Sequence, residues 1–246
     1  MEPRAYLSEL FVSVQGEGSR AGERHLFVRF AGCNLRCSYC DTPESLVRVP
    51  ECVIDWPDGR RERAANPVCA ARLAEWIDEF CSSDPAISMI ALTGGEPLVQ
   101  RRFLETFLAE QRLPRPFLLE TNALICDRVE SIAARAGIIS ADIKLPSAEG
   151  VPHWEEHERF FALCRAKRLD AKIVVGEETP ESEVCQAARL VARWAPDAVV
   201  FLQPMTDPAS GRWRITQARL WRLAALASRH APVRLRPQLH RLAGMR

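Results

Sequence analysis

Short apolar runs alternate with amphipathic stretches along most of the chain. The apolar runs predict strands at residues 10–14, 25–30, 87–92, 117–120, 138–143, 171–175 and 198–202. Apolar residues spaced near 3.6 predict helices at residues 69–80, 103–111, 128–136, 155–168, 181–194 and 217–229. Thr179 and Pro180 predict a helix start, with the Thr179 hydroxyl as N-cap and Pro180 at the first helical position. Strands that alternate with helices form a parallel sheet covered by helices, which is an α/β fold.

The number of strand–helix units narrows the architecture. Six such units in succession favour an open, partial (β/α)6 barrel over a Rossmann sheet, and the sequence has no GxGxxG motif. Residues 50–67 depart from the alternation, because they carry Pro57-Asp58-Gly59 and a charged run at residues 60–63. We interpret them as a surface insertion in a single domain spanning residues 1–246.

Composition excludes several classes of partner. Apolar residues make up 47% and charged residues 26%, as is usual for a globular protein. Lysine and arginine number 33 against 32 aspartates and glutamates, so no charge excess points to nucleic acid. Residues 1–10 lack the features of a signal peptide, and no apolar run has membrane-spanning length. We expect a cytoplasmic protein with no nucleic-acid or membrane partner.

The nine cysteines are unevenly distributed. Cys33, Cys37 and Cys40 form a C-x3-C-x2-C segment directly after a predicted strand. In a reducing compartment disulfides are not expected. We interpret the scattered remainder as small buried hydrophobes or idle thiols: Cys52, Cys69, Cys81, Cys126, Cys164 and Cys185.

The cysteine spacing predicts a metal centre. One loop can wrap three thiolates around a compact centre, but a structural zinc site needs four ligands, and no fourth cysteine or histidine lies near. A [4Fe–4S] cluster has four irons, so three cysteines leave one iron open to a non-protein ligand. The spacing therefore favours a cluster that binds and reduces a small molecule. A zinc site or a non-catalytic iron–sulfur protein remains as the alternative.

A second motif identifies the class that the cysteine segment resembles. Residues 93–97 read Thr-Gly-Gly-Glu-Pro after a predicted strand, and the two glycines let the backbone approach a ligand closely. With the cysteine segment, this loop resembles the radical S-adenosylmethionine (SAM) superfamily. The resemblance implies that SAM is cleaved reductively at the open iron and that Glu96 offers a carboxylate to the methionine ammonium of SAM. Asp142 and Lys144, at the end of a later predicted strand, resemble residues that contact SAM.

Three further segments narrow the resemblance to one family within this superfamily. Residues 9–18 end in Gln-Gly-Glu-Gly, the cysteine segment ends in Cys-Asp-Thr, and residues 238–241 read Gln-Leu-His-Arg, where the family has Gln-x-His-Lys. Gln15 offers both a donor and an acceptor, although a strand followed by a glycine turn also explains this piece. Together these segments resemble the 7-carboxy-7-deazaguanine synthase family. The resemblance implies conversion of 6-carboxy-5,6,7,8-tetrahydropterin to 7-carboxy-7-deazaguanine with loss of ammonia.

The same resemblance implies a role for individual residues. The cluster and SAM would carry out the chemistry, and no residue of the chain would act as a catalytic group. Gln203-Pro204 would line the pocket. Arg29 would pair with a carboxylate, and one threonine would suffice for a Mg²⁺ ion that keeps water and substrate as its other ligands. The expected site residues are Tyr39, Asp41, Gly95, Glu96, Asp142 and Lys144 for SAM, Thr42 for Mg²⁺, and Val14, Gln15, Gly16, Arg29, Thr93 and the terminal carboxylate of Arg246 for the pterin substrate.

The resemblance also implies partners, and one alternative enzyme class remains. It implies an electron donor such as flavodoxin, a homodimer, and a place in the biosynthesis of 7-deazaguanines, queuosine included. A glycyl-radical-enzyme activase shares the cysteine triplet and the Gly-Gly-Glu-Pro loop but acts on a protein. The Gln15 segment favours the small molecule.

Overall fold

A ten-stranded sheet forms the centre of the molecule in the computed structural model, which describes residues 3–207 and 210–245. The strand order is β12-β11-β10-β9-β8-β7-β3-β2-β4-β5. The edge strands β12 and β5 do not pair with each other in these residues, so the sheet is an open barrel, as predicted. Its parallel strands are β3 (Arg24–Phe30), β7 (Met89–Gly94), β8 (Phe117–Thr121), β9 (Ile138–Asp142), β10 (Leu169–Val175), β11 (Val199–Pro204) and β12 (Val233–Leu235).

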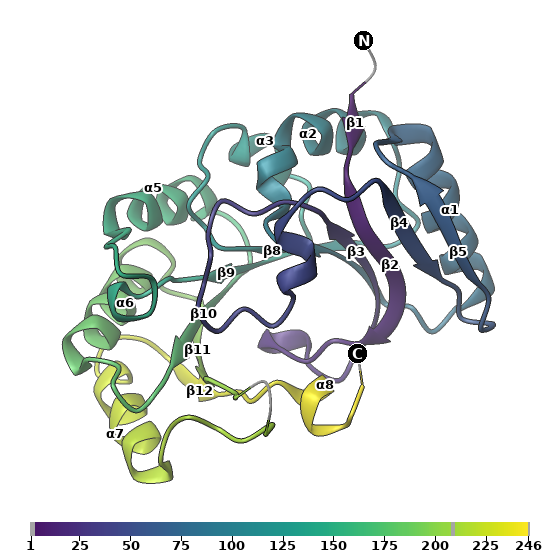
Figure 1. The fold of residues 1–246 in the computed structure, drawn as a ribbon. Helices are drawn as coiled ribbons and strands as arrows, with labels where there is room; N and C mark the ends of the chain where they lie inside the picture. Colours follow the sequence, from purple (N-terminus) through teal and green to yellow (C-terminus); the bar gives the residue numbers. More distant parts are fainter. Residues whose placement is uncertain (1–2, 208–209, 246) are drawn as a thin grey trace.

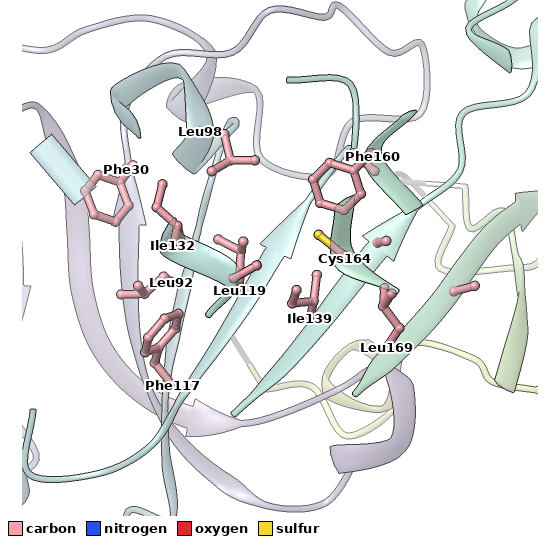
Figure 2. Close-up of a cluster of buried hydrophobic side chains, with 14 of the residues drawn as sticks. Phe30, Leu92, Leu98, Phe117, Leu119, Ile132, Ile139, Phe160, Cys164 and Leu169 are labelled. Carbon is pink, nitrogen blue, oxygen red and sulfur yellow. The ribbon is translucent and has the colours of Figure 1, made fainter. Parts of the chain in front are cut away.

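Helices surround the outer side of this curved sheet (Figure 1). They are α1 (Ala70–Ser83), α2 (Arg101–Glu110), α3 (Val129–Ala133), α5 (Trp154–Cys164), α6 (Glu181–Trp194) and α7 (Gln217–Ala227). The short helix α4 (Pro146–Glu149) follows β9 in the chain and has no buried residue. In α6 the buried residues Val184, Ala187, Ala188 and Val191 follow the spacing of one helix face. Figure 2 shows where these faces meet the sheet, with Ile132, Phe160 and Cys164 against Phe30, Leu92, Leu119 and Ile139. Leu98, from the segment after β7, packs in the same cluster.

The other side of the sheet carries polar residues at alternate positions. Successive side chains of a strand point to opposite faces, so the apolar core residue Leu92 is followed by Thr93, and Leu119 by Glu120. Along β10, Ala171 and Ile173 face the core while Lys172 lies between them. The inner face of the barrel therefore collects polar groups that lie far apart in the sequence.

The N-terminal strands extend the sheet at one edge. Strand β2 (Leu7–Val14) is antiparallel to β3 and parallel to β4 (Glu51–Asp55), which forms a hairpin with β5 (Arg61–Ala65). This hairpin occupies the segment expected to be a surface insertion. Its charged strand β5 is mostly exposed, but Cys52, Ile54 and Trp56 are buried in the core. The short strands β1 (Arg4–Ala5) and β6 (Val68–Cys69) pair with each other in a separate sheet.

The start of α6 differs in detail from the prediction. The helix begins at Glu181 as predicted, but the Thr179 hydroxyl does not cap it. Pro180 has an extended ψ of 136° and occupies the N-cap position. Thr179 lies one residue too early, and its Oγ1 instead accepts a hydrogen bond from Gly176 N at 2.9 Å. The expected cap was therefore wrong, whereas in α7 the Thr216 hydroxyl does accept from Arg219 N.

Short helices complete the chain around the open end of the barrel. They are the 3-10 helices η1 (Gly18–Arg20), η2 (Pro43–Leu46) and η3 (Pro97–Gln100), and the α-helix α8 (Leu239–Leu242). Across residues 3–207 and 210–245, no helix combines the length and the apolar character needed to cross a membrane.

Candidate active site

A cavity of about 530 Å³ lies at the carboxyl ends of the parallel strands. Barrel enzymes bind their ligands at this edge of the sheet. Arg246 lies outside the described residues. All the other site residues expected from the sequence line this cavity, namely Val14, Gln15, Gly16, Arg29, Cys33, Cys37, Tyr39, Cys40, Asp41, Thr42, Thr93, Gly95, Glu96, Asp142, Lys144, Gln203 and Pro204.

The three cysteines of the triplet lie on the segment that follows β3 and includes η2, which we call the cysteine loop (residues 31–46). Cys33, Cys37 and Cys40 are free thiols, partly exposed, and line the cavity. Burial raises the pKa of Cys33, and raises that of Cys37 to about 12. Such thiols stay protonated until a metal takes the place of the proton.

The donor set of the cysteine loop suits an iron–sulfur cluster. Within the described ranges, no three His, Cys, Asp or Glu side chains converge as the ligands of one metal ion. In a cubane cluster each thiolate binds a different iron, so three separated thiols on one loop are the donor set that it needs. The other six cysteines are absent from the cavity lining in the described part of the chain.

The loop that reads Gly-Gly-Glu-Pro packs directly on the cysteine loop. Gly95 N donates to Phe30 O at 3.1 Å, and Glu96 N donates to Gly32 O at 2.9 Å. A β-carbon on Gly95 would lie 2.6 Å from Gly32 O and 2.7 Å from Ser45 O. Gly95 lines the cavity, but its lack of a side chain is already required by this backbone contact.

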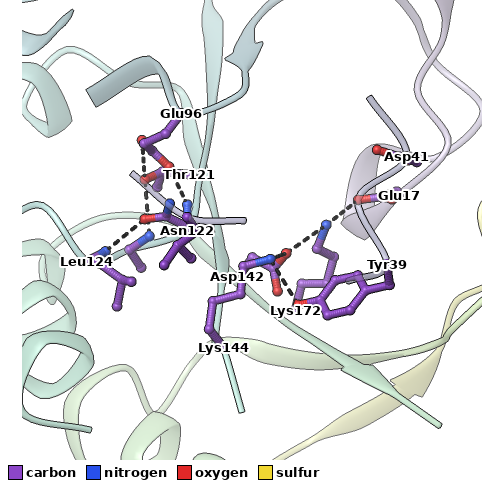
Figure 3. A network of polar contacts seen from close by, with 12 residues as sticks. Glu17, Tyr39, Asp41, Glu96, Thr121, Asn122, Leu124, Asp142, Lys144 and Lys172 are labelled. Atoms are coloured by element: carbon purple, nitrogen blue, oxygen red, sulfur yellow. Dashed lines mark hydrogen bonds and ion pairs between the residues drawn. The ribbon is translucent and has the colours of Figure 1, made fainter. Parts of the chain in front are cut away.

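Glu96 is buried and held by three protein donors, of which Figure 3 labels Thr121 and Asn122. Its carboxylate accepts hydrogen bonds from Leu98 N at 2.9 Å, Thr121 Oγ1 at 2.9 Å and Asn122 N at 2.7 Å. Burial raises the pKa of Glu96 to about 7, although these donors favour the charged form. Glu96 thereby joins the end of β8 to the start of η3 at the cavity wall.

A cluster of charges lies where β9 and β10 end. Asp142 contacts Lys144 Nζ at 2.8 Å and Lys172 Nζ at 3.2 Å, and Lys144 Nζ also lies 3.2 Å from the Tyr39 hydroxyl. Burial favours the neutral acid, but the two ammonium groups outweigh it and lower the pKa of Asp142. His157 of α5 holds this strand end from behind, since its Nε2 accepts from Lys144 N at 3.0 Å.

A third group of polar residues lies at the ends of β2, β7 and β8. Glu120 accepts from Gln15 Nε2 at 2.8 Å and from Thr93 Oγ1 at 2.7 Å. Nearby, Arg29 pairs with Glu9 at 2.8 Å. The Glu120 carboxylate thus fixes Gln15 and Thr93, two of the expected substrate contacts. Arg29, a third expected contact, already pairs with Glu9.

Thr42 occupies the start of η2. Its side chain lines the cavity, and its hydroxyl makes no hydrogen bond to any residue in the described ranges. A free hydroxyl oxygen is a suitable ligand for Mg²⁺, which accepts few protein ligands.

The C-terminal segment (residues 238–245) covers one side of the cavity. Leu239 N donates to Gly16 O at 3.0 Å, and His240, Arg241 and Met245 line the cavity. A β-carbon on Gly16 would lie 1.9 Å from His240 Nδ1, so any other residue here would displace this histidine. Gly16 thus seats the C-terminal segment.

Sequence reasoning missed Glu17, Glu120 and Lys172, which also line the cavity. A signal for two of them was present, because Glu120 and Lys172 are charged residues inside largely apolar strands. Parallel register then places them beside expected site residues, with Lys172 opposite Asp142.

This geometry can be compared with known proteins. The family model of the radical SAM superfamily matches residues 27–191. The chain therefore belongs to the radical SAM superfamily, whose members use a [4Fe–4S] cluster and SAM.

Relatives specify the family further. The chain is 39% identical to 7-carboxy-7-deazaguanine synthase of Geobacter sulfurreducens over 99% of its own length and 98% of that protein. It is 35% identical to the enzyme of that name from Methanopyrus kandleri over 98% and 94% of the two chains. Within the superfamily, the chain belongs to the 7-carboxy-7-deazaguanine synthase family. The crystal structure of QueE from Escherichia coli shares its fold, with a TM-score of 0.60 at 17% identity over 95% of this chain and 94% of that one.

Proposed function

We propose that this chain is a lyase that converts 6-carboxy-5,6,7,8-tetrahydropterin to 7-carboxy-7-deazaguanine with loss of ammonia. The observation that carries the proposal is one cavity in which the three thiols, the charged ends of β9 and β10, and the Gln15–Glu120–Thr93 group meet. Its volume suits a cofactor and a small substrate. A protein substrate, as a glycyl-radical-enzyme activase requires, is disfavoured because the C-terminal segment covers one side of the cavity.

Cys33, Cys37 and Cys40 would hold the cluster, and six residues would hold SAM: Tyr39, Asp41, Gly95, Glu96, Asp142 and Lys144. When bound, the cluster and SAM supply one-electron cleavage and abstraction of a hydrogen atom. The protein contributes orientation and charge. Lys144 keeps its ammonium charge, because Asp142 holds the pKa of Lys144 well above its usual value despite burial. Asp142 and Lys144 thus offer a fixed pair of opposite charges to the zwitterionic end of SAM.

The substrate would lie against the ends of β2, β3 and β7. Gln15, the backbone of Val14 and Gly16, and Thr93 would contact the pterin ring, with Glu120 behind two of them. Arg29 and a Mg²⁺ ion on Thr42 would bind the substrate carboxylate, supported by the free hydroxyl of Thr42 and the guanidinium at the cavity wall. The terminal carboxylate of Arg246 is proposed as a further substrate contact.

The compartment, the oligomeric state, the pathway and the electron donor of the enzyme are also proposals. We propose that it acts in the cytoplasm as a homodimer, in the route to 7-deazaguanines such as queuosine, with an electron donor such as flavodoxin. Nine free thiols in the structure agree with a reducing compartment.

The reaction is tested with the reconstituted enzyme under anaerobic conditions. The enzyme is incubated with SAM, a reductant and 6-carboxytetrahydropterin, and the products are identified by mass. We expect 7-carboxy-7-deazaguanine and ammonia in equal amounts, with SAM not consumed. SAM cleavage without any pterin-derived product would contradict the proposal and would favour another radical SAM reaction.

A further inference from the structure

A continuous series of polar contacts starts on the cysteine loop and crosses the barrel (Figure 3). The Tyr39 hydroxyl lies 3.2 Å from Lys144 Nζ, which contacts Asp142 at 2.8 Å, and Asp142 contacts Lys172 Nζ at 3.2 Å. Lys172 Nζ in turn lies 2.8 Å from Glu17 Oε2, in the loop after β2. Positive and negative groups alternate along the series, so each of its ionic contacts is charge-assisted.

Gln238, in the C-terminal segment, links the end of this series back to the cysteine loop. Gln238 Nε2 donates to Glu17 Oε1 at 3.0 Å and to Asp41 Oδ2 at 2.9 Å. A primary amide has two hydrogens on its nitrogen, so one goes to each carboxylate. The series therefore contacts the loop at Tyr39 and again at Asp41, on either side of Cys40.

We infer that Gln238 is a positioning residue for the cysteine loop and for SAM. The side chain is buried, with 8% of the residue exposed, and joins two carboxylates that would otherwise repel each other. Each carboxylate also has a cation within 4 Å, since Lys172 lies 2.8 Å from Glu17 and Arg241 lies 3.9 Å from Asp41. A neutral side chain with two N–H groups and the length of glutamine can therefore bridge the carboxylates of Glu17 and Asp41.

The consequence is a second role for the C-terminal segment. Leu239 N donates to Gly16 O, and His240 rests on Gly16, which fixes this segment to the substrate side of the cavity. Gln238 connects the same segment to the side that holds Cys40. The inference rests on the proposed function only in taking the cysteine loop as the holder of the cluster and SAM.

The test uses the full chain, loaded with its cluster under anaerobic conditions. Gln238→Met keeps the length of the side chain and removes its hydrogen-bond donor, and Gln238→Glu adds a third carboxylate beside Glu17 and Asp41. Matched controls are Gln217→Met and Gln217→Glu, because Gln217 is exposed at the start of α7. The measurements are the Kd of SAM, the electron paramagnetic resonance spectrum of the reduced cluster with SAM, and amide hydrogen exchange over residues 36–46. None of them requires the pterin.

We expect Gln238→Met to raise the Kd of SAM by about two- to thirtyfold, the usual effect of a substitution within a coupled network. Exchange over residues 36–46 should be faster and the spectrum with SAM altered, and Gln238→Glu should show larger changes of the same sign. The Gln217 variants should match the wild type. Gln238→Asn keeps the amide but shortens it, and gives a milder test should Gln238→Met fail to fold. A wild-type Kd, spectrum and exchange in Gln238 variants would overturn the inference, even with a raised KM for the pterin. If the inference holds and no pterin is turned over, only the proposed substrate is wrong.

Discussion

At the scale of single residues, hydrogen-bond polarity determines what the cavity accepts. The Thr93 hydroxyl donates to Glu120, so only its lone pairs remain for a ligand. The Gln15 amide is oriented by two bonds, because Nε2 donates to Glu120 and Oε1 accepts from Glu17 N at 3.0 Å. This part of the cavity therefore presents mainly acceptors, which suits the adjacent N–H groups on the pyrimidine half of a pterin.

The cluster ligands give the first prediction. Changing Cys33, Cys37 or Cys40 to alanine should remove the cluster and all SAM cleavage, because three ligands leave no spare. The measurement is iron and sulfide per chain, with SAM cleavage assayed in parallel. Cys126→Ala and Cys185→Ala are the controls and should keep both, because neither residue lines the cavity. Iron near the wild-type level in any triplet variant would remove that cysteine from the cluster.

The hydroxyl of Thr42 gives the second prediction. Thr42→Val keeps the shape of the side chain and removes the oxygen, so the response to Mg²⁺ or the affinity for substrate should fall. The loss should be about ten- to a hundredfold at most, the worth of a hydrogen bond or contact to a charged group. The cluster content should not change. Activity is measured across a magnesium titration, and identical curves for Thr42→Val and wild type would exclude Thr42 as a ligand.

At the scale of elements, the sequence predicts the inner strands well because both of their faces are covered. The apolar run at residues 89–92 of β7 gives a strong signal, and α6 has the bounds that its spacing predicts. The hairpin β4–β5 was missed, because its outer strand is charged and exposed while only Cys52, Ile54 and Trp56 reach the core.

The cavity residues likewise divide into those that the sequence predicted and those that it did not. Motif residues such as Cys33 and Glu96 are local in sequence and were found. The contacts of Glu17 and Glu120 join residues that are 155 and 105 positions apart, and no local pattern predicts such a pairing. Only the register of the sheet brings these residues together.

The contact between α5 and the end of β9 gives the third prediction. His157 is fully buried, and burial lowers its pKa from 6.5 to about 4. The unfolded chain therefore binds a proton on this histidine at a higher pH than the folded chain does. Stability from His157 is complete above pH 6.5 and is lost as the pH falls toward 4, by about 3 kcal/mol in total.

His157→Gln isolates this effect, because a glutamine oxygen can still accept from Lys144 N but does not titrate in this range. Glu96 acts in the opposite direction. Its raised pKa gives stability below pH 4.5 that is lost as the pH rises to about 7. Since Glu96 is present in both proteins, it cancels in their difference. Urea unfolding of the cluster-free chains from pH 4 to 7 should show wild type losing stability relative to His157→Gln as the pH falls. A constant difference would contradict a neutral, buried His157.

At the scale of the whole molecule, the first and last described elements lie at opposite ends of β2. Strand β1 precedes β2, whereas α8 contacts Gly16 just after it (Figure 1). The cavity is thereby built from the first loop, the cysteine loop, the strand ends and the last residues of the chain. Met245, the last residue that the structure describes, is part of its lining.

The last prediction concerns this end of the chain. If the terminal carboxylate of Arg246 contacts the substrate, residues added after it move that charge away from the cavity. A charge-assisted hydrogen bond is worth roughly 1.5–3 kcal/mol, or about ten- to a hundredfold in affinity. A C-terminal tag should therefore raise the KM for the pterin at least several-fold, and an N-terminal tag, attached beyond β1, should leave it unchanged. SAM affinity and cluster content should be the same in both tagged proteins, because Gln238 and its contacts precede the added residues. A C-terminal tag that raised the Kd of SAM would mean that it displaces α8, and equal kinetics for the two tagged proteins would exclude the carboxylate as a substrate ligand.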